Sequence, residues 1–177
     1  MYYRKVYHSP LGIIYMQSDG EYLTGLWFDG SRDSNKHMYD FEEKELPIFK
    51  ETSNWLDIYF SGKNPDFIPK YKIENNTKFR NQVIDIMNKI QYGEVITYND
   101  IAKKIAISNG IEKMSAQAVG GAVGWNPICI IIPCHRVVGT NGSLTGYGGG
   151  IKNKIELLKL EGNNMDKFII PKRGTAL

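Results

Sequence analysis

Residues 128–136 read Ile-Cys-Ile-Ile-Ile-Pro-Cys-His-Arg, and a glycine-rich segment follows at 142–150. The five apolar residues are rich in β-branched side chains and too few for a typical helix, so they predict a buried strand. Pro133 cannot donate a hydrogen bond to a sheet, and we expect the strand to end there. Cys134 is then held rigidly at a strand end where it can face a cavity, which indicates a reactive thiol.

The composition is typical of a soluble globular protein. The chain has 177 residues, of which 42% are hydrophobic and 23% charged, enough for one domain or two small ones. No apolar run of the length of a signal peptide or a membrane span follows the first residues. We therefore expect a cytoplasmic protein with no membrane partner.

The two cysteines and three histidines do not form a recognisable metal or disulfide motif. Cys129 and Cys134 lack the spacing of a redox Cys-x-x-Cys, and two cysteines do not make a disulfide scaffold. A structural zinc site needs about four Cys or His ligands close together, whereas the histidines here are scattered. We expect neither a metal ion nor a cofactor.

Charge is unevenly divided along the chain. Residues 1–74 hold nine Lys or Arg against twelve Asp or Glu, a net charge of −3. Residues 75–177 hold thirteen against seven, a net charge of +6. This asymmetry favours contact between the C-terminal part and a polyanion, although an ordinary solvated basic surface has the same charge.

The N-terminal part has the pattern of a small sheet with one helix. Three strand-like segments separated by turns predict an antiparallel sheet at 2–7, 12–17 and 22–28. A polar loop follows at about 31–40, and amphipathic spacing predicts a helix between Pro47 and Phe60. The polar segment 72–77 is the best candidate for a boundary.

The C-terminal part is mainly helical. Apolar residues from Phe79 to Ile90 recur at helical spacing, and Thr97 with Asp100 resembles a capping box before a short helix. Ser115 is a plausible cap for a second short helix over 116–123, which is built almost entirely of small residues. Two short helices joined by a turn favour a helix-turn-helix, and tight packing of the small residues against the core is the alternative.

A last helix is expected over 152–160, with Gly162 ending it. Glu161 lies on the apolar side of this helix and meets an unfavourable dipole at its C-terminus. Such a carboxylate needs a partner, for which His135 is the obvious candidate; a frayed, solvated terminus is the alternative. The sequence thus predicts an α+β protein with an antiparallel sheet and helix in residues 1–74 and a helical, helix-turn-helix domain in 75–177.

These motifs closely resemble the O6-alkylguanine-DNA alkyltransferases, also called methylated-DNA–protein-cysteine methyltransferases. The matching segments are Gly93-Glu94-Val95-Ile96-Thr97-Tyr98, Ala118-Val119-Gly120-Gly121-Ala122, Asn126-Pro127, residues 131–138, Gly142, Gly146-Tyr147, Gly149-Gly150, Leu157-Leu158 and Glu161-Gly162. The resemblance is strong from about residue 79 to 162. Residues 1–74 contain few of the family's motifs, but their order of strands and helix suits its ribonuclease-H-like N-terminal domain. Residues 75–177 suit its winged-helix-like domain.

The resemblance implies direct reversal of DNA damage. Proteins of this family move an alkyl group from guanine O6, in duplex DNA, irreversibly to their own cysteine, which here is Cys134. Glu161 orients His135, and His135 acts through water on Cys134, because adjacent strand residues point apart and direct contact is awkward. O4-methylthymine is a further possible substrate. No cofactor is implied, and we expect a monomer.

The resemblance also assigns residues to DNA and base binding. The helix-turn-helix enters the minor groove and the target base is flipped out, with DNA contacts from the second helix at Ala116, Gln117, Ala118, Gly120 and Gly121. Tyr98 crowds the target phosphate and meets the flipped base. Tyr147 and Gly148 form the pocket wall, the carbonyls of Cys134 and Val137 accept from the guanine amine, and Asn126 holds the turn before the active-site strand.

One residue departs from the family pattern. Many members have an arginine on the recognition helix that fills the gap left by the flipped base, and this chain has Gln117 there. Glutamine can hydrogen-bond the orphaned base but brings no charge and a shorter reach. We expect base flipping to survive with weaker DNA affinity.

Two other functions are compatible with the same residues. A sub-family that lacks the reactive cysteine only binds lesions, which Cys134 argues against here. A cysteine hydrolase that turns over with Cys134, His135 and Glu161 needs an oxyanion site and a second water, which a sequence cannot show.

Overall fold

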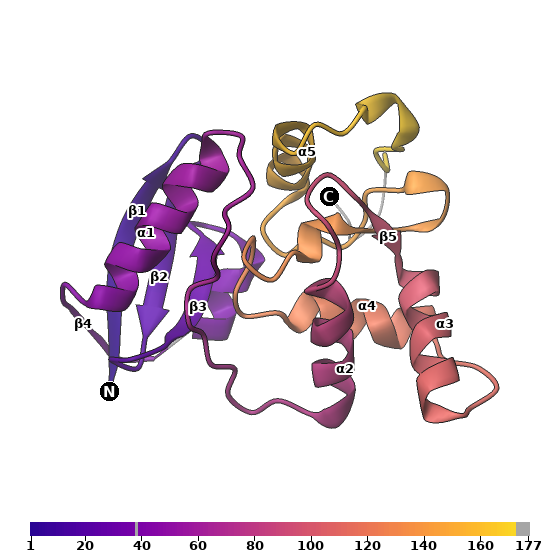
Figure 1. Ribbon diagram of the computed structural model, residues 1–177, viewed down its shortest axis with the longest axis horizontal. Helices are drawn as coiled ribbons and strands as arrows, with labels where there is room; N and C mark the ends of the chain where they lie inside the picture. The colour runs from indigo at the N-terminus through magenta and orange to yellow at the C-terminus, as the bar shows by residue number, and fades with distance from the viewer. Residues whose placement is uncertain (38, 173–177) are drawn as a thin grey trace. The chain divides into compact units, whose positions relative to one another are not determined.

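A computed structural model describes residues 1–37 and 39–172 as an α+β protein, in agreement with the predicted fold class (Figure 1). The chain forms two compact units. Unit 1 consists of Met1–Asn75 with Pro127–Ile131, and unit 2 of Asn76–Asn126 with the chain from Ile132 onward. The division into domains 1–74 and 75–177 stays a prediction.

Unit 1 is built on a four-stranded sheet in the order β3-β2-β1-β4. Its strands are β1 (Tyr2–Ser9), β2 (Gly12–Ser18), β3 (Leu23–Phe28) and β4 (Phe41–Glu43). The first three pair antiparallel, as predicted, whereas β4 pairs parallel with β1. The sequence did not predict β4, because three exposed residues carry no alternation of apolar and polar side chains. The predicted polar loop contains a 3-10 helix, η1 (Arg32–His37).

One helix, α1 (Pro47–Phe60), packs against this sheet with the bounds that the sequence predicts (Figure 1). Pro47 suits the first turn of a helix, where its missing N–H has no partner to lose. The helix buries one face, made of Ile48, Phe49, Thr52, Trp55, Leu56 and Tyr59. Ile14 and Met16 of β2 are likewise fully buried, and the core of unit 1 lies between helix and sheet.

The predicted strand at 128–132 is wrong, although its residues are buried. Only Ile128 forms a bridge, to Leu26 of β3, and the chain then turns. The Ile130 backbone has a φ of 66°, and the N–H of Ile131 donates to the Cys129 carbonyl at 2.7 Å. An isoleucine in this left-handed conformation is strained by roughly 1–3 kcal/mol. The β-branched side chains therefore reported burial, not an extended backbone.

Unit 2 contains four α-helices among the described residues, together with a short parallel pair of strands. The helices are α2 (Lys78–Met87), α3 (Tyr98–Asn109), α4 (Ala116–Trp125) and α5 (Ile151–Leu160). The strands β5 (Ile96–Thr97) and β6 (Val137–Val138) pair parallel. Single turns of 3-10 helix occur at η2 (Cys134–Arg136), η3 (Thr140–Gly142) and η4 (Met165–Lys167).

The predicted helix starts are confirmed by their caps. Thr97 Oγ1 accepts from the Asp100 N–H at 3.0 Å, and the Asp100 carboxylate accepts from the Thr97 N–H at 3.2 Å, which completes a capping box. Ser115 caps α4, which continues two residues beyond the predicted end. The helices α3 and α4 pack together as a helix-turn-helix pair. No helix in the described part of the chain is long and apolar enough to cross a membrane.

Replacing Thr97 by alanine should lower the free energy of unfolding by about 1 kcal/mol, because the Asp100 N–H loses its acceptor at the start of α3. Chemical denaturation measures the change. Thr97→Ser keeps the hydroxyl and is the matched control, expected to stay close to the wild type. Equal stability of the alanine variant and the wild type would show that the cap does not stabilise α3.

Candidate functional site

Cys134 opens the 3-10 turn η2 and is 8% exposed. Backbone hydrogen bonds fix the turn on both sides of it: the Cys134 N–H donates to Ile132, the Arg136 N–H to Pro133 and the Val137 N–H to Cys134. The site therefore sits on a tight turn and not at a strand end as predicted. The expected geometry, with adjacent strand residues pointing apart, does not apply here.

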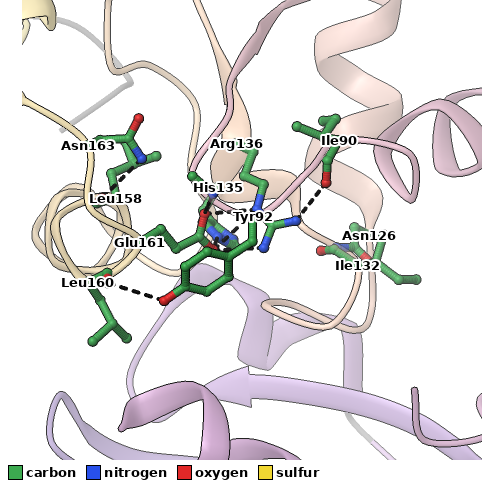
Figure 2. A network of polar contacts seen from close by, with 11 residues as sticks. Ile90, Tyr92, Asn126, Ile132, His135, Arg136, Leu158, Leu160, Glu161 and Asn163 are labelled. Carbon is green, nitrogen blue, oxygen red and sulfur yellow. Dashed lines mark hydrogen bonds and ion pairs between the residues drawn. The ribbon is translucent and has the colours of Figure 1, made fainter. Parts of the chain in front are cut away.

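Asn126 stands at the C-terminus of α4 and is buried. Its Nδ2 donates to the Ile132 carbonyl at 3.0 Å (Figure 2). This bond joins the two points where the chain of unit 2 is interrupted by 127–131. Asn126 thus ties the end of α4 to the start of the Cys134 turn.

His135 and Arg136 converge on the carboxylate of Glu161, which follows α5 (Figure 2). The His135 Nε2 lies 2.7 Å from Glu161 Oε1. Arg136 donates two hydrogen bonds to the same carboxylate, from Nε to Oε2 at 2.9 Å and from Nη2 to Oε1 at 2.9 Å. The expected pairing of Glu161 with His135 is present, and the alternative of a frayed terminus is wrong because Glu161 is buried.

The segment before β5 completes this network. Arg136 Nη1 donates to the Ile90 carbonyl at 2.8 Å, and the Gly93 N–H donates to Glu161 Oε2 at 3.3 Å. Tyr92 donates its hydroxyl to the Leu160 carbonyl at 3.2 Å (Figure 2). Gly93 has a φ of 81°, and a Cβ there would stand 3.0 Å from the Glu161 carbonyl oxygen. Glycine is needed at this position for both reasons.

Burial and the neighbouring charges determine the protonation states of Glu161 and His135. Burial alone would raise the pKa of Glu161, but hydrogen bonds and charges from His135 and Arg136 outweigh it and lower the pKa to about 2. Burial lowers the pKa of His135 despite the neighbouring carboxylate. At pH 7 Glu161 is ionised and His135 is neutral. An ionised carboxylate only accepts, so Nε2 carries the proton and Nδ1 is the basic nitrogen.

Tyr98 and Lys154 meet at one carbonyl group. The Tyr98 hydroxyl donates to the Thr145 carbonyl at 3.0 Å, and Lys154 Nζ donates to the same oxygen at 3.1 Å and to the Val137 carbonyl at 2.6 Å. Burial and the charge of Cys134 raise the pKa of Tyr98 to about 12. These contacts hold the loop 143–150, in which Tyr147 is buried and Gly148 half-buried, beside the Cys134 turn.

The second helix of the pair exposes its small residues. Gln117, Ala118 and Gly121 are exposed, while Ala116 and Gly120 are half-buried. A Cβ on Gly121 would meet no atom within 4 Å, and one on Gly120 would make only ordinary contact with the Tyr98 ring at 3.9 Å. Packing within the described structure therefore does not require these glycines. The alternative of tight packing against the core loses its support, and a surface for close approach of a partner remains.

The sequence did not reveal the roles of Arg136 and Lys154. A strand would have pointed Arg136 away from His135, whereas the 3-10 turn brings both to Glu161. A signal existed for Lys154, which is a lysine three residues before Leu157 on the apolar side of α5. Among the described residues no three His, Cys, Asp or Glu side chains are grouped to hold a metal ion.

The fold and site define a class of protein, a helix-turn-helix protein with a cysteine held beside a histidine–glutamate pair. Two family models match the chain: the 6-O-methylguanine DNA methyltransferase ribonuclease-like domain at residues 1–68 and the DNA binding domain of the same family at 78–163. The chain belongs to the 6-O-methylguanine DNA methyltransferase family.

Similar proteins span nearly the whole chain. The methylated-DNA–protein-cysteine methyltransferase of Haemophilus influenzae is 36% identical over 159 residues, 90% of this chain and 86% of the relative. That of Methanosarcina mazei is 41% identical over 165 residues, 93% and 99% of the two chains. The crystal structure of Mycobacterium tuberculosis OGT in complex with DNA is similar with a TM-score of 0.77 and 33% identity, covering 94% of each chain.

Glu161→Gln should lower the free energy of unfolding at pH 7 by roughly 3 kcal/mol or more, because Arg136 stays buried without its anion. The folded pKa of about 2 lies below the ordinary 4.5, so this stabilisation is complete above pH 4.5 and disappears as the pH falls towards 2. The stability gap between wild type and variant should narrow over that range, as measured by denaturation at several pH values.

Glu156→Gln is the matched control, because Glu156 is an exposed carboxylate on the same helix. Its effect should stay within about 0.5 kcal/mol. A gap between wild type and Glu161→Gln that is constant from pH 7 to pH 2 would contradict the assigned ionisation.

Proposed function

We propose that this protein repairs DNA by moving the alkyl group of O6-alkylguanine from duplex DNA to Cys134, in a single irreversible turnover. The observation that carries the proposal is the buried arrangement of Cys134, followed directly by a neutral His135 whose ring is held by an ionised Glu161. Membership of the family and the likeness to a relative solved with DNA support the same activity.

The neutral imidazole supplies a base for the cysteine. Thiolate is the nucleophile, so the Cys134 proton must leave before or during attack. With Nε2–H donating to Glu161, Nδ1 can take that proton through a bridging water, and Glu161 stabilises the imidazolium that forms. Arg136 keeps the carboxylate ionised and oriented throughout.

The transfer is one displacement at carbon. A bond forms between Cys134 Sγ and the alkyl carbon while the bond from that carbon to guanine O6 breaks, and the electron pair stays on the base. The base then gains a proton, so that the net exchange is the thiol proton for the alkyl group. The product is an uncharged thioether without a leaving group, and the protein is not regenerated.

Base flipping exposes the target atom. An alkylated guanine within a duplex is inaccessible to a protein side chain and must rotate out of the stack. The exposed, small-residue face of α4, with Ala116, Gln117, Ala118, Gly120 and Gly121, suits close approach to the minor groove. Residues 75–177, with a net charge of +6, favour contact with phosphates.

The flipped base is received by residues around the Cys134 turn. Tyr98 meets the base and crowds its phosphate, and Tyr147 with Gly148 forms the wall of the pocket. The carbonyls of Cys134 and Val137 accept from the guanine amine; the Val137 carbonyl keeps a second lone pair for this while it accepts from Lys154. Monomeric action, a cytoplasmic location and activity on O4-methylthymine stay predictions.

Incubation with a duplex that contains one O6-methylguanine should add one methyl group to the Cys134 peptide, stoichiometrically and permanently, as read by peptide mass. Cys134→Ser should accept none while it keeps most of its duplex affinity, and Cys129→Ala, which removes the other cysteine, is the matched control that should still be methylated. An unmodified peptide with tight lesion binding identifies a lesion sensor. Release of product with repeated turnover identifies a hydrolase.

Gln117→Arg should bind duplex DNA more tightly than the wild type, because arginine adds a charge and a longer reach on the exposed face of α4. Fluorescence anisotropy at several salt concentrations measures the affinity, and the variant should also show the steeper salt dependence. Gln91→Arg adds the same charge at another exposed glutamine and is the control, for which a smaller gain is expected. Unchanged or weaker binding by Gln117→Arg argues against α4 as the DNA-reading helix.

A further inference from the structure

Tyr92 is a half-buried tyrosine that contacts both sides of the buried ion pair, and the mechanism above gives it no part. Its hydroxyl donates to the Leu160 carbonyl at 3.2 Å, and its ring centre lies 5.8 Å from the Arg136 Cζ (Figure 2). Leu160 is the last residue of α5 and directly precedes Glu161, to which Arg136 donates. One side chain therefore joins the helix end that carries the carboxylate to the cation that binds it.

The hydroxyl contact fixes the end of α5. The last carbonyls of a helix have no partner within the helix, and the Tyr92 hydroxyl serves the carbonyl of Leu160. This carbonyl belongs to the planar peptide group that leads into Glu161, so the bond also holds the backbone from which the carboxylate extends. Burial and the charge of Glu161 raise the pKa of Tyr92, although Arg136 opposes the change. The hydroxyl therefore keeps its proton at pH 7 and can donate it.

The ring covers the part of the network that is open to water. The guanidinium group of Arg136 lies over the Tyr92 ring, within the distance of about 6 Å at which the two attract each other. The side chain of Arg136 is 11% exposed, whereas those of Glu161 and His135 are 0% exposed. Water can thus reach this ion pair only from the side of the arginine. Because water weakens the attraction between charges, a ring on that side strengthens the pair.

The backbone beside Tyr92 is bonded to both members of the same ion pair. The Ile90 carbonyl accepts from Arg136 Nη1 at 2.8 Å, and the Gly93 N–H donates to Glu161 Oε2 at 3.3 Å. The segment 90–93 therefore holds the cation and the anion through its backbone. Tyr92 is the side chain by which this segment also reaches the end of α5.

We propose that Tyr92 is a positioning residue for methyl transfer. Its hydroxyl fixes the end of α5 and its ring shields Arg136, so that Glu161 holds His135 in the orientation that serves Cys134. This role rests on the proposed transfer to Cys134 and deepens it. Tyr92 acts through the ion pair and not on the reacting atoms.

Two substitutions separate the hydroxyl from the ring. Tyr92→Phe removes the hydrogen bond and keeps the ring, whereas Tyr92→Leu removes both and leaves an apolar side chain. Tyr39→Phe and Tyr39→Leu are the matched controls, because Tyr39 is a 48% exposed tyrosine of unit 1. Circular dichroism and thermal melting show whether each variant is folded before the others are compared with it.

The first measurement is the hydrogen exchange of the Arg136 Nε–H, followed by nitrogen NMR without DNA. Tyr92→Leu should speed this exchange by about tenfold or more, because water then reaches the guanidinium group. Tyr92→Phe keeps the ring and should stay close to the wild type. The Nε–H of Arg4, which donates to Gln17 in unit 1, is the internal control and should exchange at the same rate in all variants.

The second measurement is the rate of methyl transfer from a saturating duplex with one O6-methylguanine. Tyr92→Phe should lower this rate by roughly threefold, through the lost hydrogen bond, and Tyr92→Leu by about tenfold or more, with the duplex affinity unchanged. In a His135→Gln background, which keeps the pair of Arg136 and Glu161, the same substitutions should have no further effect. A loss that acts only through the fold would be equally large in both backgrounds.

Each outcome decides the role of Tyr92. A folded Tyr92→Leu variant with wild-type exchange at Arg136 overturns it, and so does a rate loss that is the same with and without His135. If the leucine variant does not fold, an unchanged saturating rate in Tyr92→Phe overturns it instead. Such failures leave methyl transfer to Cys134 intact. If the wild type accepts no methyl group, the proposed function fails, and the exchange measurement still shows whether the ring shields the ion pair.

Discussion

The carboxylate of Glu161 is the group on which the site depends. It is buried at the end of α5. It forms hydrogen bonds with Arg136 and His135, which lie on a turn 25 and 26 residues earlier in the chain. Removal of Arg136 would leave the buried carboxylate without its counter-charge, which costs several kcal/mol, and removal of His135 would take away one of its hydrogen-bond donors. The same contact orients the imidazole and determines which of its nitrogens is basic. Stability and chemistry are therefore set by one interaction.

A 3-10 turn, and not an extended strand, allows His135 and Arg136 to contact the Glu161 carboxylate together. In an extended strand His135 and Arg136 would point to opposite faces, and Glu161 could meet only one of them. The 3-10 turn directs both to the same carboxylate and holds Cys134 at its first residue. The strained Ile130 backbone and the Asn126 side chain lie on the segment that leads into it. The apolar run that precedes the cysteine is thus a buried segment that turns, and not a strand.

Much of this could be predicted from the sequence, and the exceptions have physical causes. The α1 helix and the capping box at Thr97 follow from local patterns, which the structure reproduces. The pairing of Glu161 with His135 is expected because a carboxylate on the apolar side of α5 needs a partner, and the structure contains it. A short apolar run rich in β-branched residues indicates burial but does not determine the backbone conformation, so it predicted a strand at 128–132 where the chain turns. The partners of Arg136 and Lys154 are made across 25 and 17 residues, and no local signal fixes such contacts.

The tautomer of His135 tests the account most directly. If Glu161 is ionised and His135 is the base that serves Cys134, nitrogen NMR of the folded protein at pH 7 should find a neutral ring with the proton on Nε2 and none on Nδ1. A doubly protonated ring, or a proton on Nδ1 alone, would contradict the account, because neither form could accept the cysteine proton while donating to the carboxylate.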